Sequence, residues 1–294
     1  MKRAEFINDC HVKGFIQWIG QRMDAPGMFW HSYVLKKRQT YWECDSIYSA
    51  FEKYSWDFSF FSAIKNDRVI GNTFQDTQAI TNIISLHLKE GLKNNDNAAC
   101  RNCCLDILTW GGVKRHNDAR IFNLGDSLCN YLTNINAKFR SDRNSDEYFS
   151  RDIFINSGFT KIYSLFVEDF IMYDGRVGAA LGLLVKMYCD ENNISCIPDS
   201  LKFAWGRGKE SQYVSSEKSR RNPSSDRLFF PELLNNPQKH LECNIRANWL
   251  LKEITLRTTS KFNHLPPEVQ TTALQSALFM IGYSVRPQST ESCQ

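Results

Sequence analysis

Residues 159–181, FTKIYSLFVEDFIMYDGRVGAAL, place two side chains that could do chemistry inside an otherwise apolar run. Lys161 is a primary amine, which can act as a nucleophile on an electrophilic carbon. Asp174 is a carboxylate, which can stabilise a developing positive charge or take a proton from water. Since charged groups in a core-like segment cost free energy, they need a reason to be there. Lys161 and Asp174 are therefore the two side chains of this run whose chemistry needs an explanation.

Asp174 stands at the predicted start of a helix. The apolar residues after it recur at i, i+3, i+4, i+7, i+8 and i+11, which predicts a helix buried along one stripe. Gly175, Gly178 and Gly182 predict that another chain segment packs closely against this helix. An N-terminal carboxylate also caps a helix, so the sequence leaves two roles open for Asp174, cap and catalyst. The stripe comprises Val177, Ala180, Leu181, Leu184, Val185 and Tyr188.

The segment before Asp174 has the pattern of two helices joined by a tight turn. Residues 146–155 can form the first helix, and Phe159, Ile162, Leu165 and Phe166 have the spacing of a second. Asn-Ser-Gly at 156–158 predicts the turn between them. The expected order is helix, turn, helix, short link, Asp174 and helix.

This layout resembles the helix-hairpin-helix DNA glycosylases, in the branch with the 8-oxoguanine-DNA-glycosylase fold. INSGFTKIYS is similar to the hairpin of that family, with Thr160 and Lys161 at its Thr-Lys or Pro-Lys pair, and YDGRV is similar to its aspartate motif. ILTWGGVKRHN, residues 159–181 and NIRANWLLKEI look like blocks of a bacterial subgroup that includes antiphage enzymes excising modified bases. The resemblance covers about the last two-thirds of the chain.

The resemblance implies an enzyme that flips a modified base out of duplex DNA and hydrolyses its N-glycosidic bond, leaving an abasic site. Asp174 would then stabilise the sugar as it gains oxocarbenium character, and the hairpin residues Ser157, Gly158 and Thr160, with Arg176, would contact DNA. For Lys161 two roles stay open. The amine can form a Schiff base and cause strand cleavage, or it can bind a phosphate.

The stretch GGVKRHNDAR at 111–120 could also reach DNA. Its two glycines allow the backbone to approach a ligand, and it carries the cations Lys114 and Arg115 together with Asn117. We assign these three side chains to the DNA interface, and within this stretch Arg115 and Asn117 are the leading candidates for the wedge that replaces the flipped base. A capped helix end followed by a solvated basic loop would give the same pattern.

For the base pocket we nominate Tyr173, which directly precedes Asp174, and the tryptophans Trp205 and Trp249, which follow the catalytic helix in the sequence. Flat rings stack on bases, although aromatic residues fill cores more often. The neighbouring run from about 206 to 226 is rich in Gly, Ser and Arg, and predicts a mobile basic loop that includes Arg220 and Arg221.

The predicted fold is mostly α, a glycosylase-like helical core with a mixed or helical N-terminal subdomain. We place that subdomain at 1–95, including a helix over 76–93 capped by Asp76 with His87 on its buried face. The core then covers 96–285, its last helices near 240–254 and 268–281, and residues 286–294 form a disordered tail. Strand patterns occur only in the N-terminal third.

The composition limits the classes of protein to which the chain can belong but does not identify its function. The 294 residues are 42% hydrophobic, with ten cysteines in no paired metal-binding spacing and a net charge of +4. We expect a cytoplasmic monomer with reduced thiols, no metal, no cofactor and no membrane-spanning segment. The expected partner is double-stranded DNA carrying a modified or damaged base.

Three alternatives stay open at this point. The excised base can be a modified cytosine, such as a glucosylated hydroxymethylcytosine, in defence against phage. It can instead be 8-oxoguanine, removed by a repair glycosylase with AP lyase activity. The chain can also be a DNA-binding protein without catalysis, in which Asp174 only caps. A nuclease is disfavoured, because no Asp or Glu cluster has the spacing of a two-metal site.

Overall fold

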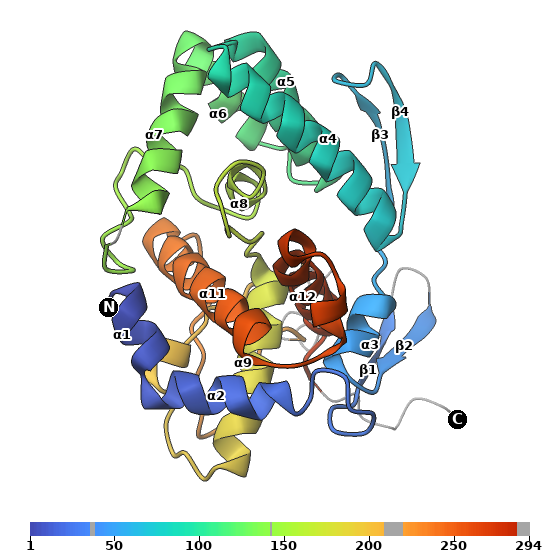
Figure 1. Cartoon of the computed structure of the whole chain (residues 1–294), viewed down its shortest axis with the longest axis vertical. Helices are drawn as coiled ribbons and strands as arrows, with labels where there is room; N and C mark the ends of the chain where they lie inside the picture. The colour runs from blue at the N-terminus through green and yellow to red at the C-terminus, as the bar shows by residue number, and fades with distance from the viewer. Residues whose placement is uncertain (36–38, 142, 209–219, 287–294) are drawn as a thin grey trace.

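The computed structural model describes residues 1–35, 39–141, 143–208 and 220–286. The chain is mostly α, as predicted (Figure 1). Figure 1 shows α4 to α7 at one end of the molecule and α2, α9, α11 and α12 at the other, with α8 between them. The longer helices are α2 (Cys10–Gly20), α4 (Phe74–Lys93), α5 (Asn97–Trp110), α6 (Asn117–Leu124), α7 (Leu128–Arg140), α9 (Gly175–Glu191), α11 (Pro237–Arg257) and α12 (Pro267–Ile281). The shorter ones are α1 (Arg3–Asn8), α3 (Ile47–Glu52) and α8 (Phe159–Tyr163).

Two antiparallel hairpins account for the named strands in the described part of the chain, and both lie in the N-terminal third. Strand β1 (His31–Leu35) pairs with β2 (Thr40–Cys44), and β3 (Phe58–Ser62) pairs with β4 (Asp67–Gly71). The carboxylate of Asp106 on α5 fixes the second hairpin, accepting hydrogen bonds from Ser62 Oγ at 2.5 Å and from the Ala63 amide at 3.1 Å. The strand prediction for this third is confirmed.

The N-terminal residues pack against the last helices of the chain. Helix α3 packs on α12 and α1 on α11. Tyr33 of β1 is fully buried and donates its hydroxyl hydrogen to Met280 O at 2.8 Å. The predicted helices near 240–254 and 268–281 are present as α11 and α12. The N-terminal residues and the last two helices of the described chain therefore pack together as one unit.

Helix α4 was predicted, but two details of the prediction were wrong. Its N-cap is Thr73, and Asp76 is the third helical residue of a capping box in which the two side chains bond each other's backbone amides. His87 is exposed, and its ring nitrogen bonds Ile83 O one turn earlier. Since the first turn already has a Thr cap, the helix begins earlier than the predicted residue 76.

The predicted helix over 146–155 does not form. This segment consists of turns and irregular backbone. Two tyrosine hydroxyls hold its end instead: Phe154 N donates to Tyr131 Oη at 2.9 Å, and Tyr163 Oη donates to Phe154 O at 2.6 Å. Because the backbone groups of Phe154 are bonded to side chains, they are not available for a helical ladder. The helix before the 156–158 turn was therefore a wrong prediction.

Helix α9 confirms the prediction made from periodicity. All six residues of the predicted apolar stripe are buried. Gly178 and Gly182 face neighbouring segments: a methyl group on Gly178 would collide with Ala204 O, and one on Gly182 would lie 2.5 Å from Pro223. The small residues allow residues 204–206 to approach the start of the helix that Asp174 caps.

We expect Gly178→Ala to destabilise the protein by about 2–4 kcal/mol, because the Ala204 backbone has to move to admit a methyl group. Thermal unfolding of the variant checks this. Ala180→Gly, a change in the same helix that removes a buried methyl group, is the comparison and should cost about 1–2 kcal/mol through helix propensity and lost packing. Equal unfolding temperatures for wild type and Gly178→Ala would contradict the close approach.

The predicted basic loop is only partly described, since 209–219 lie outside the described residues. In its later part the two arginines are buried. Arg220 and Arg221 are 6% and 9% exposed, and Arg220 Nε donates to Tyr283 O at 3.1 Å while its guanidinium stacks on the Tyr283 ring at 4.3 Å. These two arginines therefore pack into the fold, contrary to the prediction of a mobile cationic loop. The predicted disordered tail beyond 286 also lies outside the described residues.

No helix in the described part of the chain combines the length and the apolar character needed to cross a lipid bilayer. Helices α4 and α5, on either side of the predicted boundary at residue 95, pack against each other across a short connection. The division into 1–95 and 96–285 stays a prediction.

Candidate active site

Lys161 and Asp174 line one cavity of about 1200 Å³. Helix α8 contributes Lys161, and Asp174 stands directly before α9. Further wall residues come from the segment before β3, from α4, from the end of α5 and from α12. The two candidate catalytic residues, thirteen positions apart in the sequence, therefore line one shared cavity.

One hydrogen bond between their sequence neighbours ties the two residues together. Thr160, next to Lys161, is fully buried and donates its hydroxyl hydrogen to Tyr173 O at 3.2 Å. His240 Nε2 donates to the same carbonyl at 2.9 Å, and burial lowers the pKa of this imidazole, which keeps it neutral. Since Tyr173 O directly precedes Asp174, these bonds fix the link that separates the carboxylate from α8.

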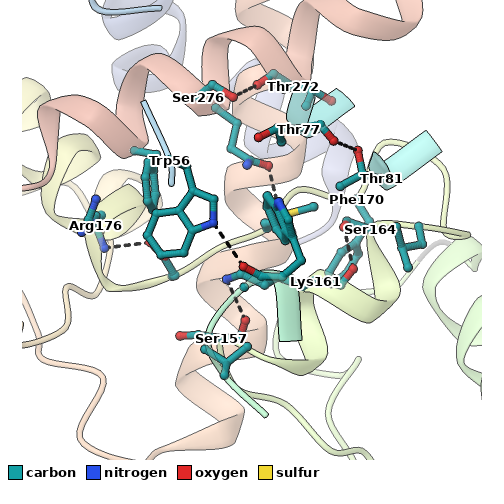
Figure 2. A pocket seen from close by; sticks show the side chains of 18 of the residues that line it. Trp56, Thr77, Thr81, Ser157, Lys161, Ser164, Phe170, Arg176, Thr272 and Ser276 are labelled. Atoms are coloured by element: carbon teal, nitrogen blue, oxygen red, sulfur yellow. Dashed lines mark hydrogen bonds between the residues drawn. The ribbon is translucent and has the colours of Figure 1, made fainter. Parts of the chain in front are cut away.

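Lys161 is held in an extended position inside the cavity. The side chain is only 7% exposed, and Nζ donates to Ser157 O at 3.0 Å (Figure 2). Its methylene stem passes over Gly111, where a methyl group would lie 2.6 Å from Cδ and 2.7 Å from Cε. A side chain at residue 111 would occupy the path of the lysine. Gly111 is thus the residue that allows the amine to reach its position.

We expect Gly111→Ala to displace Lys161 and to lower the rate of the reaction that Lys161 serves by about tenfold, because small misplacements of a reacting group are costly. A methyl group on the adjacent Gly112 would meet no atom of the described residues within 4 Å, but Gly112 has a φ of +63°. Gly112→Ala is the matched control, since it strains the loop without touching Lys161. Equal losses in both variants would argue for a loop effect.

Asp174 caps α9 through one oxygen. Oδ1 accepts from the amides of Arg176 at 2.8 Å and Val177 at 3.1 Å. Burial by itself raises the pKa of this carboxyl, but the charges of Lys161 and Arg176 and the Val177 amide outweigh it, so the pKa of Asp174 lies below its ordinary value. The side chain is partly buried and lines the cavity. The site therefore presents a carboxylate that stays ionised.

Arg176 lies among aromatic rings at the same end of the cavity. Its guanidinium carbon is 4.3 Å from the ring centre of Phe279, 5.0 Å from that of Tyr283 and 5.9 Å from that of Trp56. All four residues line the cavity. Stacking holds the cation near Asp174 and leaves its charge to lower the carboxyl pKa.

Trp56 is one of several aromatic residues of the cavity that the sequence did not single out. Figure 2 shows Trp56 in the cavity wall. Its indole Nε1 donates to Trp110 O at 3.2 Å, and its ring meets Phe279 edge-on at 5.6 Å between centres. Trp56 is half-buried, so part of its face is open to the cavity. The aromatic-rich composition of 28–61 was the only signal that could have identified it.

The three residues nominated for the base pocket do not line the cavity. Tyr173 is fully buried, and its hydroxyl donates to Ala204 O at 2.6 Å. Trp205 is 5% exposed, with Nε1 donating to Phe230 O, and Trp249 packs on Phe6 with ring centres 5.6 Å apart. All three are core residues, as large aromatic side chains commonly are.

The turn at 156–158 does not offer its amides as the resemblance implies. The side-chain oxygen of Asn156 accepts from the amides of Gly158 at 2.8 Å and Phe159 at 3.1 Å, so both donors are already bonded. Gly158 and Thr160 are buried, and their assignment to DNA contact is not supported by this geometry. Ser157 is partly exposed and lines the cavity.

The loop at 111–117 divides into a structural and an exposed part. Asn117 is 7% exposed: its Nδ2 donates to Val113 O at 2.8 Å, and its Oδ1 accepts from Asn156 Nδ2 at 2.9 Å. It therefore binds this loop to the 156–158 turn and cannot act as a wedge. Lys114 and Arg115 are exposed and directly follow Gly111, Gly112 and Val113, which line the cavity.

Comparison of the chain with protein-family models, with curated proteins and with solved structures finds no match. In the described ranges, no three His, Cys, Asp or Glu side chains gather closely enough to hold a metal ion. The chemistry of the site therefore depends on the groups that line its large cavity: an ionised carboxylate, a buried amine, a stacked guanidinium and aromatic side chains.

Proposed function

We propose that the protein is a DNA glycosylase that receives a flipped base in the cavity and hydrolyses its N-glycosidic bond, leaving an abasic site. The observation that carries the proposal is the pairing of Lys161 and Asp174 on one cavity wall, with the pKa of Asp174 held below its ordinary value. Breaking an N-glycosidic bond leaves positive charge on the sugar, and an ionised carboxylate stabilises that charge.

The mechanism uses Asp174 as a preorganised anion. Oδ1 accepts from the amides of Arg176 and Val177, which fixes the direction of the carboxyl group. The other oxygen can then face the sugar or orient a water molecule toward its anomeric carbon. Lys161, whose charge keeps Asp174 ionised, lies where an amine can react with the sugar aldehyde of an abasic site.

Aromatic and cationic groups in the cavity suit a flipped nucleotide. Trp56 and Phe279 offer ring faces and edges against which a base can pack, and base-aromatic stacking contributes about 1–3 kcal/mol. Arg176 and Arg207 line the wall and can attract the phosphates beside the flipped nucleotide. Lys114 and Arg115, exposed beside the cavity, are the candidates for contacts with the duplex.

The size of the cavity favours a bulky modified base over 8-oxoguanine. Sites for drug-sized ligands typically measure about 300–1,000 Å³, and this cavity reaches about 1200 Å³. A purine with one added oxygen would leave most of this space unfilled. A cytosine with a large substituent, such as a glucosylated hydroxymethyl group, would use more of it, which fits a role in defence against phage with modified DNA.

The test is excision from defined duplexes. Purified protein is incubated with otherwise identical DNA carrying cytosine, 5-hydroxymethylcytosine, its glucosylated form or 8-oxoguanine, and strand breaks are scored after hot alkali. We expect alkali-labile breaks in the glucosylated duplex and a released base of matching mass. Breaks confined to 8-oxoguanine would favour the repair alternative. Salt-sensitive binding without an abasic product from any duplex would favour a DNA-binding protein without catalysis.

A further inference from the structure

Two helices line the cavity with rows of hydroxyl side chains. Helix α4 contributes Thr77, Thr81 and Ser85, and α12 contributes Thr272 and Ser276. Within each helix these residues are four apart, so they share one helical face. Figure 2 shows Thr77, Thr81, Thr272 and Ser276 in the same part of the cavity wall. The hydroxyls form two rows along a single cavity.

The hydrogen bonds of these groups fix what they can offer a ligand. Thr81 Oγ1 donates to Thr77 O at 2.8 Å, Ser85 Oγ to Leu165 O at 2.5 Å, and Ser276 Oγ to Thr272 O at 2.9 Å. A hydroxyl has one hydrogen to donate and two lone pairs that accept. Since these three hydrogens are used by backbone carbonyls, the hydroxyl oxygens of Thr81, Ser85 and Ser276 can meet a ligand only as acceptors. The hydroxyl of Thr77 lies 3.4 Å from Tyr54 Oη, and either oxygen can be the donor.

The side chains between the hydroxyls are uncharged amides. Gln78 and Asn82 of α4 and Gln275 of α12 line the cavity as well. Gln275 Oε1 accepts from the Met172 amide at 2.7 Å, which orients its amide nitrogen as the group left to donate. Lys89 of α4 and Glu268 of α12 lie one turn beyond the rows and also line the cavity, so the uncharged stretch is confined to the rows themselves. That stretch differs from the end with Lys161, Asp174 and Arg176, where charge dominates. Its complement is a neutral group that carries several hydroxyl hydrogens.

We propose that the hydroxyl rows of α4 and α12 are a specificity-determining surface that reads a neutral, hydroxyl-rich substituent on the excised base. The inference rests on the proposed glycosylase function and adds which part of the cavity selects the substrate. A base without such a substituent would leave the acceptors without ligand donors, and a site built to hydrogen-bond hydroxyls discriminates against ligands that lack them. The substituent would extend away from Asp174 along the two helices.

The test removes hydroxyls without changing shape. We expect the double variant Thr81→Val, Ser276→Ala to lower single-turnover excision of a glucosylated 5-hydroxymethylcytosine by roughly tenfold or more, since each lost hydrogen bond costs a few-fold to tenfold. Excision of 5-hydroxymethylcytosine in the same sequence, slower in wild type, should change less than twofold. The discrimination between the two duplexes is the quantity measured.

Thr109→Val is the matched control. Thr109 of α5 donates to Leu105 O at 2.7 Å, the same bond one turn back that Thr81 makes, but it does not line the cavity. It should leave the discrimination unchanged. Equal losses on both duplexes in the double variant would overturn the inference while the glycosylase function stands, and so would a wild type that excises only 8-oxoguanine. Absence of any abasic product with wild-type protein would overturn the proposed function itself.

Discussion

Replacing Asp174 by asparagine should lower base release by about a thousandfold while leaving the protein folded. A unit charge about 4 Å from the developing cation, at an effective dielectric of about 20, contributes roughly 4 kcal/mol, which corresponds to that factor in rate. Asparagine caps helices about as well as aspartate, so the start of α9 should persist. Single-turnover release on the preferred duplex and the unfolding temperature are the two measurements.

Asp96→Asn is the matched control for this prediction. Asp96 caps α5 in the same way, with its carboxylate accepting from the amides of Ala98 and Ala99, and it does not line the cavity. Its substitution should change neither the rate nor the unfolding temperature by much. If Asp174→Asn lowered the unfolding temperature and kept full activity, Asp174 would be a cap and not a catalyst.

The pH dependence of stability gives an independent check on Asp174. Because the folded pKa lies below the ordinary value of 3.8, the charged form contributes stability above that value, and this contribution is lost as pH falls through the lower folded pKa. Wild type should therefore lose more stability than Asp174→Asn on acidification below about pH 4. If Asp174 is the group that controls the rate, base release should stay level from neutral pH down to about pH 5, because the carboxyl stays ionised over this range.

Local sequence features determined the start and the buried face of α9, and these could be predicted. A cap and an apolar period depend on residues within a few turns, so the capping position of Asp174 and the apolar stripe after it were predicted correctly. The Lys161–Asp174 pairing also followed from a short stretch. The helix over 146–155 could not be excluded in this way, because the tyrosines that hold Phe154 come from α7 and α8.

The cavity wall was not predictable from neighbouring positions. Trp205 and Trp249 were nominated because they follow α9 in the sequence, yet both point into the core. Trp56 faces the cavity, although it lies in the N-terminal third. Its position depends on how the segment before β3 packs against α12. No periodicity within one element reports on that packing, since hydrophobic patterns distinguish buried from exposed faces and do not say which cavity a face lines.

Replacing Lys161 by glutamine should remove covalent trapping of the protein on abasic DNA and lower base release by about tenfold to a hundredfold. The amine is buried in the cavity and hydrogen-bonded to Ser157 O, whereas Lys114, the candidate for phosphate contact, is exposed. Borohydride reduces a Schiff base to a stable adduct, so denaturing gels of protein mixed with abasic duplex and borohydride report the amine directly. Wild type should give the adduct.

Lys161→Arg separates the charge of this residue from its nucleophilicity. Arginine keeps a positive charge near Asp174 but forms no stable Schiff base, so it should give no adduct and retain more base release than the glutamine variant. Lys138→Gln controls for loss of a half-buried amine, since Lys138 Nζ donates to Ser150 Oγ and does not line the cavity. Wild-type base release by Lys161→Gln would assign this lysine to phosphate contact or packing. An adduct that persists in this variant would place the nucleophile elsewhere, so the two substitutions separate the electrostatic role of Lys161 from its covalent one.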